Sequence, residues 1–241
     1  MPKQISLRIT IGGILRFKGK LYTAKYKTQF ILILILALSS LCTPLSAQER
    51  RPGKLFPPEK IDILEKPRKW QDIDKIMYMM RIRKGDVVAD IGAGSGYFTI
   101  PLARKVGTEG RVYAEDIQKE MTDYISQKVK KLQLKNIRII LGKVENPLIP
   151  NNSLNYAFIA NTYHQLERPL LLLYNIKKDL RSHGKLVIID WDPTKDPFFG
   201  PPREVKVPVD TVIKEAEKAG FRLMEKHDFM PYHYFLIFKY F

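Results

Sequence analysis

The chain has 241 residues, of which 45% are hydrophobic and 27% charged, a composition that fits one α/β domain with a short extension and excludes low-complexity and repeat architectures. Its formal net charge is +16, but residues 1–54 carry ten Lys or Arg and one acid, so more than half of the excess lies in the N-terminal part. The charge therefore gives little support to a nucleic-acid partner, and none is expected.

The N-terminal 47 residues have the pattern of a targeting segment. A basic flank without acids, residues 1–29, precedes the apolar run Phe30–Cys42, and a small-residue cleavage site follows near Ala47. The apolar run is short for a spanning helix, which needs about 20 residues. We predict a signal peptide or an N-terminal membrane anchor over residues 1–47. The protein is then exported (periplasmic or extracellular) or membrane-anchored, with a cytoplasmic location as the alternative.

The only cysteine, Cys42, lies in that apolar run, so disulfides and cysteine chemistry are excluded from the rest of the chain. No metal site is predicted. Residues 48–69 are basic and rich in proline, a composition typical of a linker. The following stretch predicts the first helix of a domain over residues 70–241. Its apolar residues recur at helical spacing, at Trp70, Ile73, Ile76, Met77 and Met80.

From residue 84 onward, strand and helix patterns alternate. Strands are expected at residues 86–91, 111–116, 136–141, 153–161, 184–191, 221–229 and 233–241, and helices at 96–106, 119–134, 169–180 and 209–220. A turn at 182–184 precedes the fifth strand. The last two strands are joined by the short turn 230–232, so they must be antiparallel. The pattern predicts a Rossmann-like, doubly wound, mostly parallel seven-stranded sheet with its last strand antiparallel.

In such sheets the ligand crevice lies at the carboxyl ends of the strands. There the first strand ends in Asp90, followed by Gly92, Gly94 and Gly96. A dinucleotide fingerprint needs a glycine or alanine where this chain has Tyr97, and an acid facing a pyrophosphate about 4 Å away costs roughly 1–4 kcal/mol. The same acid attracts a cationic ligand such as S-adenosylmethionine, whose carboxylate the turn amides can meet.

The segments "VADIGAGSGYFT" and "GRVYAEDI" resemble motifs I and II of the class I S-adenosylmethionine-dependent methyltransferases, and the likeness extends over about residues 70–241. The resemblance implies the class I methyltransferase fold, S-adenosyl-L-methionine as cofactor, and methyl transfer by in-line displacement. The acceptor is expected to be a small molecule.

Carried over position by position, the resemblance places Asp90 near the methionine moiety and Asp116 on the ribose hydroxyls, with Ile117 beside it. The glycine turn, with Ala93 inside it, lies against the cofactor. Glu115 is expected to point to the other face of the sheet.

At the adenine end the family often has an acid where this chain has Lys143. Glu145, or the backbone at Val144, is the expected substitute.

The end of the fourth strand faces the transferred methyl group in the family. Here it reads Asn161, Thr162, Tyr163 and His164, which is not the Asn-Pro-Pro-Tyr motif of amino-directed enzymes. Asn161 is expected to contact the cofactor. His164 and Tyr163 are the catalytic candidates, with His164 as a general base. A polar residue that braces the next loop is the structural alternative for His164.

Two further stretches border the expected crevice. The long loop 192–208 carries Phe198 and Phe199, which suit an apolar lid. Tyr232, His233 and Tyr234 near the last turn are either substrate contacts or strand core.

Three functions remain open from the sequence. The leading hypothesis is a methyltransferase, the runner-up is a catalytically silent S-adenosylmethionine-binding module, and an NAD-dependent oxidoreductase is disfavoured by Asp90 and Tyr97. The membrane is a partner only through an uncleaved leader.

Overall fold

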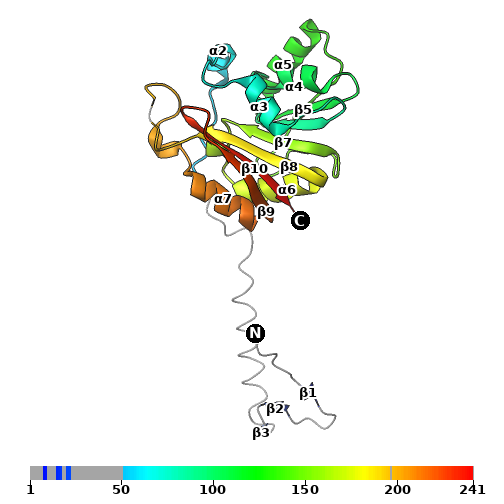
Figure 1. Ribbon diagram of the computed structural model, residues 1–241, viewed down its shortest axis with the longest axis vertical. Coiled ribbons are helices and arrows are strands. Elements are labelled where there is room, and N and C mark those ends of the chain that lie inside the picture. The colour runs from blue at the N-terminus through cyan, green and yellow to red at the C-terminus, as the bar shows by residue number, and fades with distance from the viewer. Residues whose placement is uncertain (1–7, 10–14, 18–19, 23–50, 196, 241) are drawn as a thin grey trace. The chain divides into compact units, whose positions relative to one another are not determined.

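The computed structural model describes residues 8–9, 15–17, 20–22, 51–195 and 197–240, in two compact units, Met1–Glu49 and Arg50–Phe241 (Figure 1). In the first unit, β1 (Arg8–Ile9), β2 (Leu15–Phe17) and β3 (Lys20–Tyr22) form an antiparallel sheet in that order. The predicted apolar run and cleavage site lie outside the described residues. Within the described part of the chain, no helix is long and apolar enough to cross a bilayer.

The second unit alternates strands and helices as the sequence predicts. Its strands are β4 (Val87–Ile91), β5 (Arg111–Asp116), β6 (Ile137–Leu141), β7 (Leu154–Ala160), β8 (Leu180–Trp191), β9 (Phe221–His227) and β10 (His233–Tyr240). Its helices are α2 (Ile61–Glu65), α3 (Ile73–Met80), α4 (Thr99–Val106), α5 (Lys119–Lys131), α6 (Pro169–Asp179) and α7 (Val209–Lys218). Short 3-10 turns lie at η3 (Pro58–Lys60), η4 (Tyr163–Gln165) and η5 (Arg203–Val205).

The seven strands of this unit form one sheet in the order β6-β5-β4-β7-β8-β10-β9. The strand β10 is antiparallel to both β8 and β9, and the pairs from β6 to β8 are parallel. The predicted fold class, with its last strand antiparallel, is confirmed. The strand order reverses between β4 and β7, which opens a crevice at their carboxyl ends.

One expected turn is absent. The sequence predicts a turn at residues 182–184, but β8 runs through it from Leu180. Leu154 of β7 pairs with Leu180 and Tyr156 pairs with Lys185, so the extra residues bulge between these two pairs. His183 has a φ of 67° at this bulge. The pairing of β7 with β8 continues on both sides of the bulge. For this reason β8 runs through residues whose sequence is typical of a turn.

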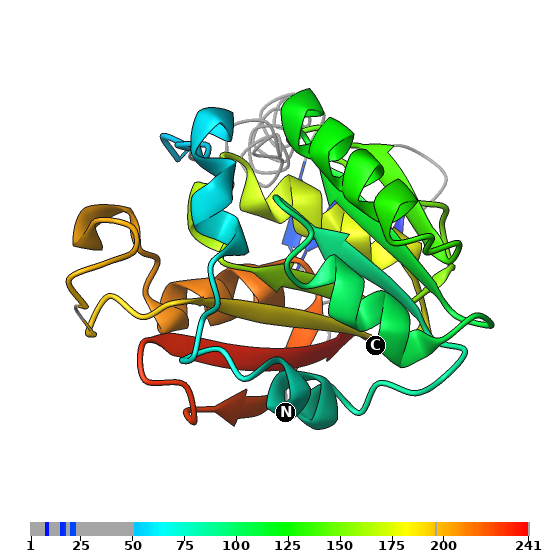
Figure 2. The same cartoon turned by 90° about the horizontal axis from the view of Figure 1, so that it is seen from above.

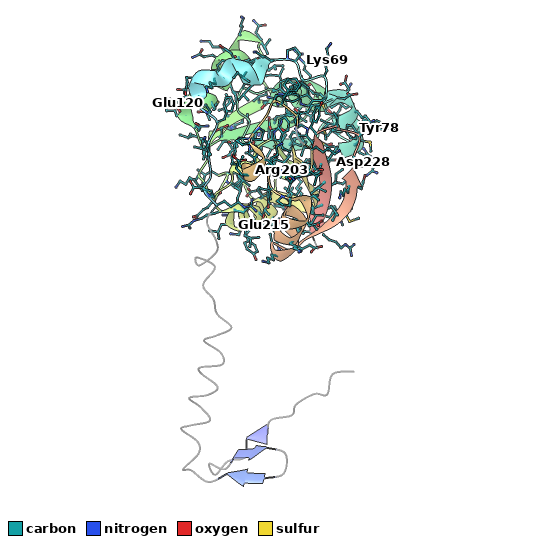
Figure 3. The ribbon with its side chains drawn as sticks, turned by 90° about the vertical axis from the view of Figure 1, so that its left-hand side faces the viewer. Lys69, Tyr78, Glu120, Arg203, Glu215 and Asp228 are labelled. Carbon is teal, nitrogen blue, oxygen red and sulfur yellow. The ribbon has the colours of Figure 1, made fainter. Side chains whose placement is uncertain are left out.

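Helices cover both faces of the sheet, because alternate strand residues point to opposite faces. On one face α3, α4 and α5 pack on strand residues that include Val88, Val112 and Ala114. On the other face α6 and α7 pack on Ala89, Ile91, Tyr113 and their neighbours. Figure 3 labels Glu120 of α5 at the upper left of the domain and Glu215 of α7 near its bottom. The central strands β4 and β7 are therefore buried on both faces, and a ligand reaches them at the strand ends.

Residues 51–69, expected to be a linker, lie against the domain; we call them the strap. The backbone N–H of Phe56 donates to Gln165 Oε1 at 3.2 Å, and Gln118 Nε2 donates to the carbonyl of Phe56 at 3.2 Å. Farther along, Lys128 Nζ donates to both carboxylate oxygens of Glu65 at 2.7 Å. The strap is thus held to residues that follow β5 and β7.

Candidate functional site

The glycine turn after β4 lies at the reversal point of the sheet. Gly92 and Gly94 have φ values of 69° and 55°, a region that glycine enters without strain. A Cβ on Gly92 would lie 2.3 Å from Thr162 Cγ2, so only glycine lets the turn approach the end of β7 this closely. Thr162 Oγ1 donates to the carbonyl of Gly92 at 3.2 Å. These contacts fix the glycine turn against the carboxyl end of β7.

Three acids lie buried around this turn. Asp90 accepts a 2.6 Å hydrogen bond from Thr99 Oγ1, and Asp116 accepts from the N–H groups of Gly94 and Gln118, each at 2.9 Å. Glu115 Oε2 accepts from the N–H of Gly92 at 3.4 Å. Every one of these donors is neutral. The turn therefore gathers three buried carboxyl groups, and none of these hydrogen bonds comes from a positively charged group.

Burial raises the pKa of the Asp90 carboxyl to about 7, with Asp116 adding repulsion and the Thr99 hydrogen bond opposing the rise. Burial also raises the pKa of Asp116, against the N–H groups that it accepts from, and raises that of Glu115 well above its ordinary value. A cationic ligand would relieve this penalty, and a pyrophosphate would increase it. The site thus has the charge that a sulfonium and ammonium ligand requires.

Glu115 lies on the face of the sheet opposite to Asp116, as expected, because it pairs with Ile91 of β4, whose side chain packs in the core under α6 and α7. Its carboxylate nevertheless reaches past the strand end to the N–H of Gly92. A Cβ on Gly142 would lie 1.7 Å from Glu115 Oε1, so Gly142 leaves the room for this side chain. Strand alternation sets where a side chain starts, and the length of glutamate lets it reach the site.

The expected adenine end is a tight turn after β6. Lys143 and Asn146 exchange backbone hydrogen bonds of 2.9 and 3.0 Å across Val144 and Glu145. The carboxylate of Glu145 pairs with Arg168 Nη1 at 2.5 Å. The carboxylate of Glu145 therefore has Arg168 as its partner, and the backbone at Val144 is the better candidate for an adenine contact.

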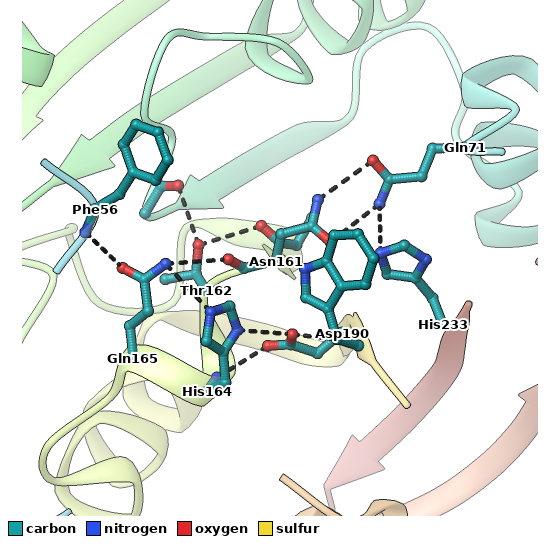
Figure 4. Close-up of polar contacts among 11 residues, drawn as sticks. Phe56, Gln71, Asn161, Thr162, His164, Gln165, Asp190 and His233 are labelled. Carbon is teal, nitrogen blue, oxygen red and sulfur yellow. Dashed lines mark hydrogen bonds and ion pairs between the residues drawn. The ribbon is translucent and has the colours of Figure 1, made fainter. Parts of the chain in front are cut away.

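A histidine and an aspartate meet at the ends of β7 and β8. His164 Nδ1 lies 2.8 Å from Asp190 Oδ1, and the backbone N–H of His164 donates to Asp190 Oδ2 at 2.9 Å (Figure 4). Both side chains are buried, at 8% and 1% exposed. Burial alone would raise the pKa of Asp190, but the charge and hydrogen bond of His164 and the N–H of Trp191 bring it below its ordinary value. A carboxylate that accepts from Nδ1 leaves Nε2 as the acceptor nitrogen.

Tyr163 does not lie with His164. Its side chain is fully buried among the residues under α6 and α7, and its hydroxyl donates to Glu215 Oε2 at 2.7 Å. The guanidinium of Arg51 lies 5.5 Å from its ring centre. The structure gives the predicted catalytic role of Tyr163 no support, because adjacent residues of a 3-10 turn point in different directions.

Asn161 joins β7 to the segment before α3. Its φ is 56°, a conformation that asparagine tolerates better than most residues. Gln71 Nε2 donates to Asn161 Oδ1 at 3.1 Å and lies 3.4 Å from His233 Nε2 (Figure 4). Gln71 is therefore a residue of the site that sequence patterns missed, since no motif surrounds it and its partners lie 90 and 162 positions away.

The strap closes the cofactor side of the crevice. Leu64 of α2 lies against the turn, with its Cδ1 3.1 Å from where a Cβ on Gly94 would be. Lys128 Nζ, which pairs with Glu65, also donates to the carbonyl of Ser95 at 3.2 Å. Arg68 lies over the Tyr97 ring at 4.3 Å. Three points along the strap thus contact the residues that follow β4.

Comparison with known proteins agrees with this geometry. A family model described as a methyltransferase domain matches residues 82–229. The demethylmenaquinone methyltransferase of Geobacillus sp. (strain WCH70) is 31% identical over 122 residues, which are 51% of this chain and 51% of that protein. The chain spans about half the length of the curated relatives it matches.

Solved structures show the same similarity. The crystal structure of a SAM dependent methyltransferase from Aquifex aeolicus is 32% identical, with a TM-score of 0.73 over 76% of this chain and 98% of that one. A putative type 11 methyltransferase from Sulfolobus solfataricus shares the fold at 23% identity, with a TM-score of 0.52 over 64% of this chain and 83% of that one.

Proposed function

The chain belongs to the methyltransferase domain family and has S-adenosylmethionine as its implied cofactor, and from that premise we propose that it methylates a small-molecule acceptor with His164 as general base. The observation that carries the proposal is the buried His164–Asp190 pair, which lies two residues beyond Thr162, the residue that bonds to Gly92 of the glycine turn.

The residues around the turn suit this cofactor. S-adenosylmethionine supplies a methyl group activated by a positively charged sulfur. The raised pKa values of Asp90, Glu115 and Asp116 support a site that gains from a cation, and we assign to Asp116, at the end of β5, the hydrogen bonds from the ribose hydroxyls. Ala93 is buried inside the turn, and the N–H groups of Gly92 and Gly94 on either side of it donate to Glu115 and Asp116. Ile117 and Val144 flank this set after β5 and β6.

The role of His164 follows from its partner. Asp190 orients the imidazole and stabilises the imidazolium that forms when Nε2 takes a proton from the acceptor. Gln165 Nε2 lies 3.5 Å from this Nε2, at the edge of the site. An acceptor with an ionisable O–H or N–H gains most from such a base.

The test uses the full-length protein in two stages. Calorimetry first measures binding of S-adenosylmethionine and of its demethylated product, and failure of both to bind contradicts the proposal. An acceptor screen then follows release of the demethylated cofactor, and it includes demethylmenaquinone because several relatives bear that name. Binding without turnover of any acceptor would instead identify a silent binding module.

The matched variants are His164→Gln and Asp190→Asn. Both should lower kcat while leaving the affinity for the demethylated cofactor within about twofold, because neither residue contacts the acids around the glycine turn. Wild-type turnover by His164→Gln would show that His164 only braces the loop that follows β7.

A further inference from the structure

Aromatic side chains from three separate segments surround one ring of the loop after β8. Trp70 comes from the residues before α3, Trp191 ends β8, and Tyr232 and His233 lead into β10; we call these four residues the aromatic box. The ring centre of Phe199 lies 4.5 Å from that of Trp70, 5.2 Å from Tyr232 and 6.0 Å from Trp191. Trp191 and His233 are themselves 4.2 Å apart. Phe199 is therefore the ring that the box holds.

The loop that delivers Phe199 is shaped to lie on the box. Gly200 has a φ of 95°, and a Cβ there would lie 2.8 Å from the Trp191 ring. Lys206 Nζ lies 5.9 Å from the centre of the same ring. The neighbouring Phe198 is fully exposed, so of two adjacent phenylalanines only one is inserted. In Figure 2 the loop projects on the side of the sheet that also carries α2.

The box adjoins the reaction centre. His233 is linked through Gln71 to Asn161 at the end of β7, over contacts of 3.4 and 3.1 Å. Trp191 directly follows Asp190, the partner of His164, and its backbone N–H donates to Asp190 Oδ1 at 2.7 Å. Figure 4 shows Gln71, Asn161, Asp190 and His233 near one another, where β7 and β8 end and β10 begins. A molecule in the box would thus lie next to the proposed base.

Two polar atoms of the box are buried and, within the described residues, make no hydrogen bond: Trp70 Nε1 and His233 Nδ1. The His233 side chain is 1% exposed. Burial lowers the pKa of His233 to about 4, so its ring is neutral. Its Nδ1 can then form one hydrogen bond with a neutral oxygen of a ligand. Buried polar atoms without partners are uncommon. The described residues have six such side-chain atoms, and two of them belong to the residues that enclose the Phe199 ring.

We propose that the aromatic box is the acceptor site, that it takes a planar aromatic ring bearing a hydroxyl or carbonyl oxygen, and that Phe199 occupies it until the acceptor displaces the loop. The proposal rests on the proposed methyltransferase function and names the acceptor class of that same site. Aromatic walls favour a flat ring over a puckered one, because offset and edge-to-face contacts need a π face. When no acceptor is bound, the Phe199 ring occupies the same place and covers the side chains of the aromatic box.

Tryptophan fluorescence reports on the aromatic box, since Trp70 and Trp191 are the two tryptophans of the protein. Phenol and cyclohexanol, which share a six-membered ring and a hydroxyl but differ in planarity, are titrated into the full-length protein with demethylated cofactor present. Phenol should change the tryptophan fluorescence and cyclohexanol should not. Equal responses, or none, would contradict the assignment of the acceptor class.

Phe199→Ala and Phe198→Ala form the matched pair of variants. Removing Phe199 should tighten phenol binding by up to about tenfold, the gain expected if the open box is about a tenth populated. Phe198→Ala should leave the affinity within twofold. Weaker phenol binding by Phe199→Ala would show that Phe199 is a wall of the site and would overturn its role as occupant.

A cavity made by the substitution alone must be distinguished from an acceptor site. With methyl-labelled S-adenosylmethionine bound to the wild-type protein, nuclear Overhauser contacts are expected between the ring protons of phenol and the labelled methyl group. Their absence would contradict the placement of the acceptor in the box. Calorimetry of the demethylated cofactor on the same samples tests the proposed function separately, because neither phenylalanine is among the residues around the glycine turn.

Discussion

The two halves of the site are assembled over very different distances along the chain. In the cofactor half, at the ends of β4, β5 and β6, the acids lie close in sequence to their partners: Asp90 to Thr99 is 9 positions and Asp116 to Gly94 is 22. In the acceptor half, at the ends of β7, β8 and β10, Gln71 reaches Asn161 across 90 positions and His233 across 162. The cofactor half is thus a local motif, and the acceptor half exists only in the folded chain.

The halves also differ in charge. Burial raises the pKa of all three acids in the cofactor half, whose hydrogen-bond donors are neutral. In the acceptor half, Asp190 has a histidine partner that lowers its pKa, and burial keeps His233 neutral. The cofactor half is suited to a positively charged ligand, and the acceptor half is suited to a neutral molecule. Four predictions test this contrast.

The largest effect is expected at the base. His164→Ala should lower kcat by about 10²–10⁴-fold, the usual contribution of general base catalysis, and should leave cofactor affinity unchanged. Release of the demethylated cofactor under saturating acceptor measures kcat, and calorimetry measures affinity. A variant that loses cofactor affinity in proportion to kcat would show that the two halves are not separable.

The next effect is expected at the ribose acid. Asp116→Ala removes a charged hydrogen-bond acceptor, and a net loss of one such bond, about 1.5–3 kcal/mol, should raise the Kd for S-adenosylmethionine by roughly 10–150-fold. Asp123→Ala on the exposed side of α5 is the control and should leave the Kd unchanged. An unchanged Kd in Asp116→Ala would move the ribose contact to Glu115.

The pH dependence of stability tests the charge of the cofactor half. Between the ordinary pKa of 3.8 and the folded value of about 7, the folded protein keeps a proton on Asp90 that the unfolded chain has lost. The stability of the cofactor-free protein should therefore fall as pH rises from about 4 to about 7. Thermal unfolding should show a loss of several degrees over this range, and Asp90→Asn should flatten the curve. A curve that rises with pH in both proteins would contradict the raised pKa.

The smallest effect is expected where the strap is tied to the glycine turn. Lys128→Met removes the bonds to Glu65 and to the carbonyl of Ser95, and should weaken cofactor affinity by roughly two- to fivefold, or about 0.5–1 kcal/mol. Lys119→Met is the matched control, because its pair with Asp123 on the same helix is solvent-exposed. Equal losses in both variants would indicate a general effect of charge.

Sequence patterns predict the fold well because the periodicities that mark strands and helices are local. The seven strands, the two layers of helices and the antiparallel β10 all follow from hydrophobic spacing and short turns. The errors arise where tertiary contacts prevail. The bulge near His183 continues a strand through an expected turn, and the strap packs on the domain although its composition is typical of a linker.

The site divides in the same way. The glycine turn and Asp116 can be located from the sequence because each directly follows a strand. The face of Glu115 also follows from strand alternation, but the contact of its carboxylate with the N–H of Gly92 does not. Tyr163 and His164 are adjacent in sequence, yet one lies in the core and the other beside Asp190.

The sequence by itself determined that β4 is followed by a turn suited to a cationic cofactor, because an acid and glycines at the end of a strand are short-range features. Only the tertiary structure decided which side chains meet at the ends of β7 and β8 and the start of β10. Gln71, Asp190, Trp191 and His233 come from segments whose meeting depends on the order of the strands. That order is a global property of the packed sheet, and no local pattern encodes which strand ends become neighbours.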